Sequence, residues 1–175
     1  MRLKKINSLK KYLPSNIKYY LCNSLVLSLF DYGDVVYHNS LSQRTSKSIQ
    51  KLQNACMRFA FNIDFRSHIT PYLSDNSILS MSNRRRSHIF NFIYKIIKSG
   101  KPPYLRDLFN IREHTHFTRN RDDFIIQSHS SANFQRSFSY FAIQMWNRLS
   151  SEVKNYPPIV FRRYINTILL DEQKA

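Results

Sequence analysis

Glycine is nearly missing from this 175-residue chain, which contains only two. This scarcity argues against a turn-rich β-sandwich or barrel, and against a glycine-rich loop that cradles phosphate groups. Acidic residues are also few, since 11 Asp and Glu accompany 27 Lys and Arg. No long apolar run occurs either. The longest, residues 19–30, is interrupted by Asn23 and Ser24 and is too short to span a bilayer.

Cysteine is limited to Cys22 and Cys56, and both fall inside helical patterns near apolar positions. We expect reduced core thiols, with a disulfide between them as the less favoured alternative. The lysines at the N-terminus are not followed by an apolar segment, so no secretory signal is expected. These features predict an intracellular protein, nuclear or cytoplasmic, that is neither secreted nor bound to a membrane.

Helical periodicity is the main pattern that the chain does contain. Hydrophobic residues make up 42% of the sequence and aromatic residues 14%, which supplies an ample core. The expected fold is mainly α, a bundle of about five to six helices with a short irregular or β-hairpin-like insert near residues 112–136. The insert could hold a strand pair at 116–119 and 124–127. Longer helices are predicted at 15–32, 42–61, 77–98, 137–149 and after Pro157.

The segment that contains the only tryptophan, residues 137–149, organises the expected core. Its apolar residues recur at the spacing of one helix face, and a side chain as large as Trp146 usually anchors its neighbours. The inner face of the helix that Ser15 would cap is expected to consist of Ile17, Leu21, Ser24 with Leu25, and Ser28. The predicted core positions are Leu21, Leu25, Leu52, Phe59, Phe92, Ile96, Phe138, Phe141, Met145, Trp146 and Leu149.

Positive charge is concentrated in one part of the chain. Residues 1–110 hold 18 basic and 5 acidic side chains, a net charge of +13, whereas residues 111–175 hold 9 and 6, a net charge of +3. Such an excess indicates a polyanionic partner, with nucleic acid favoured over a membrane surface. A soluble basic protein without such a partner is the alternative.

Two groups of cations lie apart from the apolar faces. Arg44, Lys47, Lys51 and Arg58 share one narrow arc of the helix predicted at 42–61, and no acidic residue occurs between Asp34 and Asp64. A second group follows on the helix predicted at 77–98. We predict nucleic-acid contacts from both groups, against the alternative of a solvated surface or, for the arginine triplet, of a cluster like a nuclear-localisation signal. The residues of the second group are Arg84, Arg85, Arg86, Lys95 and Lys98.

No catalytic set can be assembled from the sequence. His114 and His116 do not share a helix face and have no cysteine pair beside them, so no metal site is predicted. Asp122 and Asp123 form the one paired carboxylate, but two-metal chemistry needs a further carboxylate. A turn pair balanced by neighbouring arginines is the favoured interpretation. We predict no cofactor.

Several motifs, in order along nearly the whole chain, resemble one protein family. The chain is similar to the region that follows the polymerase palm in jockey-like non-LTR retrotransposon reverse transcriptases. The resemblance is carried by Tyr20–Tyr37 (YLCNSLVLSLFDYGDVVY), Leu52–Arg58 (LQNACMR), Pro102–Leu105 (PPYL), Thr118–Arg119 and Ser137–Leu149 (SFSYFAIQMWNRL).

The resemblance implies that residues 1–63 form the thumb of an RNA-directed DNA polymerase and residues 64–175 its helical C-terminal extension, packed as one continuous unit. In that family the thumb grips the template–primer duplex of RNA or DNA. The palm with its aromatic-x-Asp-Asp metal site, the fingers and the endonuclease domain are missing. We therefore expect a truncated product of the element that binds nucleic acid without sequence preference and has no polymerase activity alone. The alternative is an inert structural product of a decayed mobile element.

Overall fold

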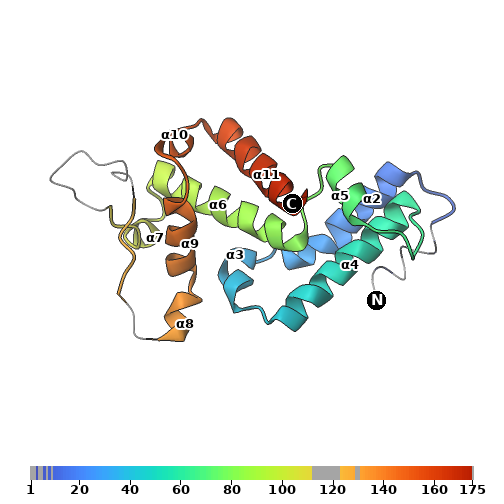
Figure 1. The fold of residues 1–175 in the computed structure, drawn as a ribbon, viewed down its shortest axis with the longest axis horizontal. Coiled ribbons are helices and arrows are strands. Elements are labelled where there is room, and N and C mark those ends of the chain that lie inside the picture. Colours follow the sequence, from blue (N-terminus) through green and yellow to red (C-terminus); the bar gives the residue numbers. More distant parts are fainter. Residues whose placement is uncertain are drawn as a thin grey trace. The chain divides into compact units, whose positions relative to one another are not determined.

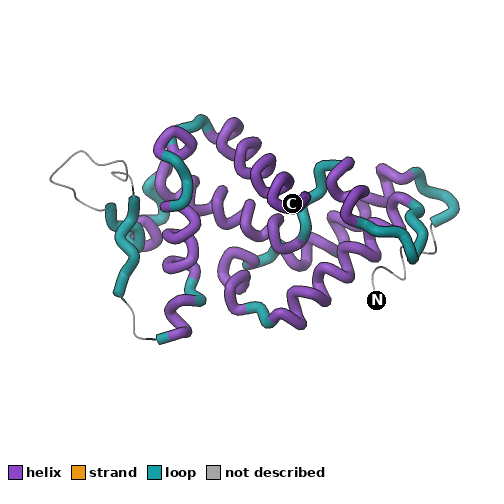
Figure 2. Tube along the Cα trace, in the orientation of Figure 1, coloured by secondary structure: helices purple, strands orange, loops and turns teal. Residues whose placement is uncertain are grey.

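The chain is built from helices in the computed structural model, which describes residues 3, 6, 8, 10–111, 123–128 and 131–174. Across these residues there are ten α-helices and two 3-10 helices and no strand (Figures 1 and 2). The mainly α fold is therefore confirmed. The α-helices are α2 (Ser15–Leu25), α3 (Asp34–Tyr37), α4 (Gln43–Phe61), α5 (Thr70–Asp75), α6 (Met81–Ser99), α7 (Pro103–Arg106), α8 (Ala132–Gln135), α9 (Phe138–Asn147), α10 (Ser151–Lys154) and α11 (Pro158–Lys174).

Local signals explain where the long helices begin and end. Ser42 precedes α4 and its hydroxyl accepts a hydrogen bond from the Thr45 amide at 3.1 Å, which satisfies one of the helix's unpaired donors. Asn62 ends the same helix in the left-handed region, with φ 54°. Gly100 follows α6 with φ 66°, a conformation that favours glycine. α6 begins at Met81, later than predicted, because Ser77 also adopts a positive φ, 53°, and interrupts the helical path.

The first predicted helix is shorter than expected, because α2 ends at Leu25 and a 3-10 helix, Leu27–Phe30, follows it. The Ser24 hydroxyl donates to the Tyr20 carbonyl at 2.8 Å, and the Ser28 hydroxyl donates to the Ser24 carbonyl. Such bonds to the preceding turn compete with regular helical geometry and often bend a helix. Pro14, rather than Ser15, occupies the position before the first helical residue.

The expected strand pair has no counterpart in the described part of the chain. Phe124 forms a single antiparallel bridge with Ile111, and residues 125–128 have no regular structure. The other expected strand, 116–119, lies outside the described residues, as do His114, His116 and Asp122.

The chain divides into two compact units, and the first comprises residues 1–34, 41–85 and 169–175. In this unit α2 packs along α4, and Cys22, Met57 and Met81 are almost completely buried in its core. Leu73 and Ile78, which follow α4 in the chain, belong to the same core. The division expected at residue 63 therefore differs from the one observed, since the segment after α4 completes the core of the helices before it.

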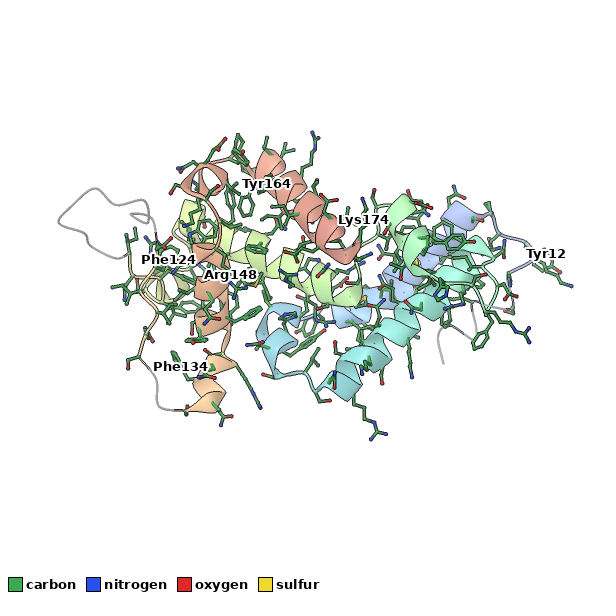
Figure 3. The ribbon with its side chains drawn as sticks, viewed as in Figure 1. Tyr12, Phe124, Phe134, Arg148, Tyr164 and Lys174 are labelled. Atoms are coloured by element: carbon green, nitrogen blue, oxygen red, sulfur yellow. The ribbon has the colours of Figure 1, made fainter. Side chains whose placement is uncertain are left out.

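The second unit comprises residues 35–40 and 86–168. Its core is an aromatic cluster around Trp146 of α9, which is 2% exposed. The ring centroids of Phe161, Phe124 and Tyr94 lie 6.1, 6.2 and 6.5 Å from that of Trp146, and Tyr94 stacks on Phe161 at 4.3 Å. Aromatic pairs at these separations contribute beyond their buried area. Phe124 belongs to this cluster and is labelled in Figure 3.

The eleven predicted core positions differ in burial. Phe59, Ile96, Met145 and Trp146 are buried. Six others are half-buried: Leu21, Leu52, Phe92, Phe138, Phe141 and Leu149. Leu25 was predicted to be in the core, but it is 45% exposed, and Ile17 of the predicted inner face is 40% exposed. Ser24 and Ser28, also predicted for that face, are exposed as well. The buried line of this segment instead runs through Lys18, Cys22 and Val26. Because neighbouring helical residues point about 100° apart, a buried Val26 turns Leu25 toward solvent.

Candidate nucleic-acid interface

Three cations form a row along the exposed side of α4, and we call Arg44, Lys47 and Lys51 the α4 basic row. All three are exposed. They fall within about 60° of helix arc, because they are separated by three and four residues. The opposite side of α4 is held by burial of Ile49, Cys56, Met57 and Ala60. Packing of that side fixes the direction in which the basic row points.

The α4 basic row carries its charge without compensation from the protein. Across the described residues, no hydrogen bond or ion pair engages the side chains of Arg44, Lys47 or Lys51. Like charges one turn apart on a helix destabilise it by about 0.2–0.5 kcal/mol per pair. The core contacts of α4 offset this cost. The row is therefore a stretch of positive potential on a rigid element, which can follow a phosphate backbone.

Arg58, the fourth predicted member of this group, is engaged by the loop that follows α4. Its Nη2 donates to the Ser67 carbonyl at 2.9 Å and its Nε donates to the Asp64 carbonyl at 3.4 Å. The guanidinium also lies 5.8 Å from the centroid of the Phe65 ring. These partners are neutral, so Arg58 holds the loop in place and keeps its positive charge.

An open groove lies at the C-terminal end of the same side of α4, with a volume of about 660 Å³. Ala55, Arg58 and Asn62, which line it, continue the helical spacing of the α4 basic row. Lys10 and Phe65 line the groove from outside the helix. The groove thus combines two cations with an aromatic ring that is 86% exposed.

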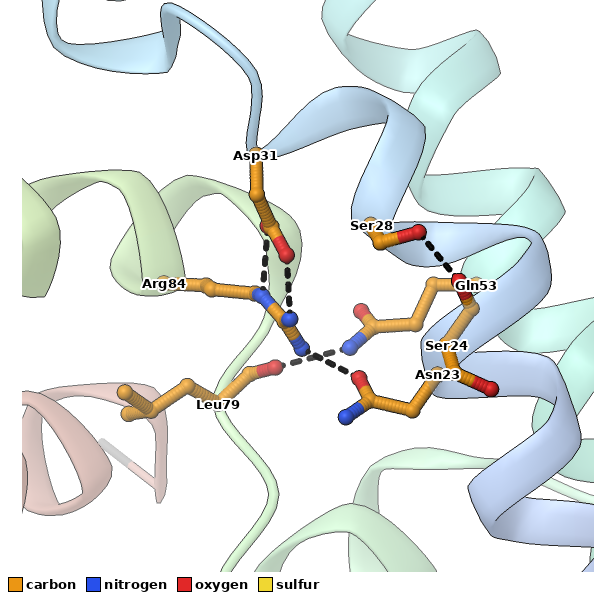
Figure 4. Close-up of polar contacts among 7 residues, drawn as sticks. All are labelled: Asn23, Ser24, Ser28, Asp31, Gln53, Leu79 and Arg84. Atoms are coloured by element: carbon orange, nitrogen blue, oxygen red, sulfur yellow. Dashed lines mark hydrogen bonds and ion pairs between the residues drawn. The ribbon is translucent and has the colours of Figure 1, made fainter.

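Arg84 was predicted to contact nucleic acid, and the structure gives it a different place. Its Nε and Nη2 donate to the two carboxylate oxygens of Asp31 at 2.7 and 2.5 Å, and its Nη1 donates to Asn23 at 2.7 Å (Figure 4). A bidentate pair of this kind is among the stronger polar contacts in proteins. The pair neutralises Arg84 and ties α6 to the segment that follows α2. Arg84 is therefore not a free phosphate ligand.

Arg85 is buried, with 1% of its surface exposed, and its Nη2 donates to the Ser46 hydroxyl at 3.4 Å. The prediction that it contacts nucleic acid is contradicted by this burial. Arg86 is half-buried. Consecutive residues of a helix point in directions about 100° apart, so three arginines in a row cannot share one exposed face. The triplet is dense in sequence but is dispersed by the helix.

In the second unit, Lys95 and Lys98 are exposed on α6, as expected for a binding surface. They line a groove of about 490 Å³ together with Arg162 of α11, and Lys98 Nζ lies 5.9 Å from the centroid of the Tyr94 ring. Sequence reasoning did not include Arg162, because only the packing of α6 against α11 brings it to the lysines. The sequence signal available for Arg162 was that it falls off the apolar face of the last helix.

Of the groups considered for catalysis, Asp123, Cys22 and Cys56 lie in the described part of the chain, and all three make structural contacts. Asp123 accepts a hydrogen bond from Lys154 Nζ at 2.8 Å, and the two side chains are 16% and 5% exposed. Cys22 and Cys56 are free thiols, both completely buried, and the Cys22 thiol donates to the Cys56 carbonyl at 3.8 Å. The side-chain hydrogen bond with Cys22, followed by burial, raises the pKa of the Cys56 thiol. A raised pKa makes a thiol a poor nucleophile at neutral pH.

No protein-family model, no curated protein and no solved structure matches this chain. No helix among the described residues combines the length and the apolarity needed to cross a membrane.

Proposed function

We propose that this chain is a nucleic-acid-binding helical module, the thumb and adjoining extension of a non-LTR retrotransposon RNA-directed DNA polymerase. It binds template–primer duplex through phosphate contacts and without sequence preference. The α4 basic row provides the contacts in the first unit, with Arg58 at its end. Lys95, Lys98 and Arg162 provide a second basic surface. The proposal assigns no catalytic residue to the chain.

The observation that carries the proposal is the state of the α4 basic row. Arg44, Lys47 and Lys51 are exposed, share one side of a helix and lie in a stretch of sequence without acidic residues. Arg84, in contrast, is neutralised by Asp31. An uncompensated row on a rigid helix suits a polyanion whose charges repeat at regular intervals.

The sequence resemblance and the helical fold support the proposal independently. The motifs at 20–37 and 52–58, which resemble the thumb region of such polymerases, include all of α2 after Tyr19 and the middle of α4. In an element of this class the chain would work inside the cell, in the nucleus or cytoplasm, within the ribonucleoprotein of the element. The palm and fingers of such a polymerase would be its partners in a longer product.

The test is a filter-binding titration with RNA, DNA and RNA–DNA hybrid duplexes at increasing salt. We expect affinity for all three and a linear fall of log K with log salt, because binding releases counterions. The triple variant R44E/K47E/K51E should bind at least tenfold more weakly and lower the salt slope by about two to three, at roughly 0.9 per lost phosphate contact.

A matched control distinguishes the effect of losing the α4 basic row from the effect of lowering the net charge of the chain. The variant R136E/R148E/K174E changes the total charge equally but at three exposed cations outside the proposed surfaces. It should bind much more tightly than the α4 triple variant. Equal losses in both variants would mean that total charge alone drives binding. Absence of binding by the unmodified chain would favour the inert product of a decayed element.

A further inference from the structure

We propose that the groove at the C-terminal end of α4 takes one unpaired nucleobase of a single-stranded segment, stacked on Phe65, with its phosphate held by Lys10 and Arg58. This inference rests on the proposed function and adds a ligand to it. The α4 basic row then binds the phosphate backbone of the adjacent nucleotides. The groove distinguishes a single-stranded end from a continuous duplex.

The first argument is the exposure of Phe65. A phenylalanine side chain is ordinarily buried, yet 86% of this one is exposed, so it contributes little to the core. It is nevertheless held in position, because Arg58 lies over the ring and bonds to the carbonyls of Asp64 and Ser67 on either side of it. A rigidly placed, solvent-exposed aromatic ring is the group on which single-stranded nucleic-acid binders stack bases.

The second argument is the polar lining of the groove. Lys10 is exposed and Arg58 has no acidic partner, so both suit a phosphate group. Asp64 also lines the groove, and its Oδ1 accepts the Arg66 amide at 2.8 Å, so the lining carries two cations and one carboxylate. The Asn62 side-chain oxygen accepts a hydrogen bond from Lys18 Nζ at 3.3 Å. A lysine ammonium only donates, so the amide nitrogen of Asn62 points away from it and is a donor for the edge of a base. Asn62 is exposed at the rim, within the groove lining.

The third argument is continuity with the α4 basic row. Lys51, Ala55, Arg58 and Asn62 succeed one another on one side of the helix, at intervals of about 4.5–6 Å along its axis. A nucleic-acid backbone that binds the α4 basic row can therefore continue along the same side of the helix into the groove. The volume of about 660 Å³ accommodates a nucleotide. An unpaired base can stack on the exposed Phe65 ring, whereas the bases of a continuous duplex are already stacked on one another.

The test compares two ligands, a blunt RNA–DNA duplex and the same duplex with a short single-stranded overhang, by fluorescence anisotropy at one salt concentration. The unmodified chain should bind the overhang form more tightly. Phe65→Ala should reduce that preference by roughly five- to a hundredfold, the range measured for loss of one stacked base. Phe65→Trp should retain it, and emission of the new indole should be quenched on binding. Trp146, which is buried, gives a constant background.

Two controls identify stacking as the cause. Tyr32→Ala removes an aromatic ring that is 88% exposed in the same unit, outside the groove, and should leave the preference intact. An overhang of abasic nucleotides keeps the phosphates and should lose the preference in the unmodified chain. Because Phe65 is exposed, its variants should retain the circular dichroism spectrum and melting temperature of the parent.

The outcomes separate this inference from the proposed function. If Phe65→Ala keeps the full preference while R44E/K47E/K51E still weakens binding, the base site is wrong and the duplex-binding function stands. An abasic overhang that binds as well as a normal one has the same meaning. If the unmodified chain binds neither duplex, both proposals fail.

Discussion

Arg84 is joined to Asp31 by two hydrogen bonds, at 2.7 and 2.5 Å, although the two residues lie 53 positions apart in the chain. Their side chains are 21% and 24% exposed, so the pair is only partly screened by solvent. Asn23 accepts a third hydrogen bond from the guanidinium. In the sequence, Arg84 looks like part of a surface cluster. In the structure it links the start of α6 to the segment that follows α2.

Arg84→Ala is therefore expected to affect stability and not binding. The variant leaves Asp31 without its partner, and we expect a loss of about 2 kcal/mol in the free energy of unfolding, below the range for fully buried pairs. Urea denaturation measures it. Arg44→Ala, at an exposed and unpaired position, should change stability by less than about 0.5 kcal/mol and weaken nucleic-acid binding. If Arg84→Ala weakened binding without a loss of stability, and Arg44→Ala lowered stability without weakening binding, the structural role of Arg84 would be contradicted.

Ser42→Ala tests the start of the helix that carries the α4 basic row. The variant removes the hydroxyl that accepts the Thr45 amide, which should cost about 1 kcal/mol. Ser48→Ala is the matched control, because Ser48 is exposed within the same helix and its hydroxyl donates to the Arg44 carbonyl. Alanine is the better helix former there, so the control should be neutral or slightly stabilising. Equal losses in both would mean that Ser42 is not an effective cap.

Local chemistry made much of the fold predictable from the sequence. The boundaries of α4 follow from Ser42 and from the chain reversal after Phe61, and the end of α6 follows from Gly100. The apolar stripe of α9 led to the aromatic core around Trp146. In each case the deciding contacts lie within one or two turns of the residue. Periodicity and capping report such contacts directly.

The inner face of α2 and the fate of the arginine triplet could not be predicted, because contacts distant in sequence decide both. Lys18 is 3% exposed because its ammonium reaches Asn62 and lies 5.9 Å from the Phe59 ring centroid, and this burial rotates Leu25 outward. Asp31, far upstream, decides the role of Arg84. The groove beside Phe65 depends in the same way on a loop that is held by Arg58.

Asp123→Ala should destabilise the second unit rather than abolish a reaction. It leaves the ammonium of Lys154, which is 5% exposed, without its carboxylate, and breaking such a buried pair costs about 3 kcal/mol. Asp171→Ala is the control, since its pair with Lys174 is 3.5 Å long and both side chains are more than half exposed. That loss should stay below about 0.5 kcal/mol. The double variant D123A/K154M should recover most of the stability. A metal-dependent activity that vanishes in D123A while stability is unchanged would contradict this structural role.

The Cys56 thiol should make stability fall at alkaline pH, against a smaller opposite contribution from Cys22, whose pKa is lowered by its hydrogen bond with Cys56. The hydrogen bond with Cys22 and then burial raise the folded-state pKa of Cys56 above its ordinary value of 9.0. A raised pKa means that the folded chain holds the proton more tightly than the unfolded chain does. The contribution to stability is complete below pH 9.0 and declines as pH rises beyond it, because only the unfolded thiol ionises there. Urea midpoints measured between pH 7 and 10 should fall at the alkaline end.

The Cys56→Ala variant isolates this effect, since its midpoint should depend less on pH over the same interval whatever its absolute stability. Native-state labelling gives a second readout. Cys22 and Cys56 are completely buried, so a thiol reagent should modify them only after unfolding, at a rate that follows the urea-dependent population of unfolded chains. Rapid labelling of the folded protein, or a midpoint with the same pH dependence in Cys56→Ala and the parent, would show that these thiols are not held as the structure places them.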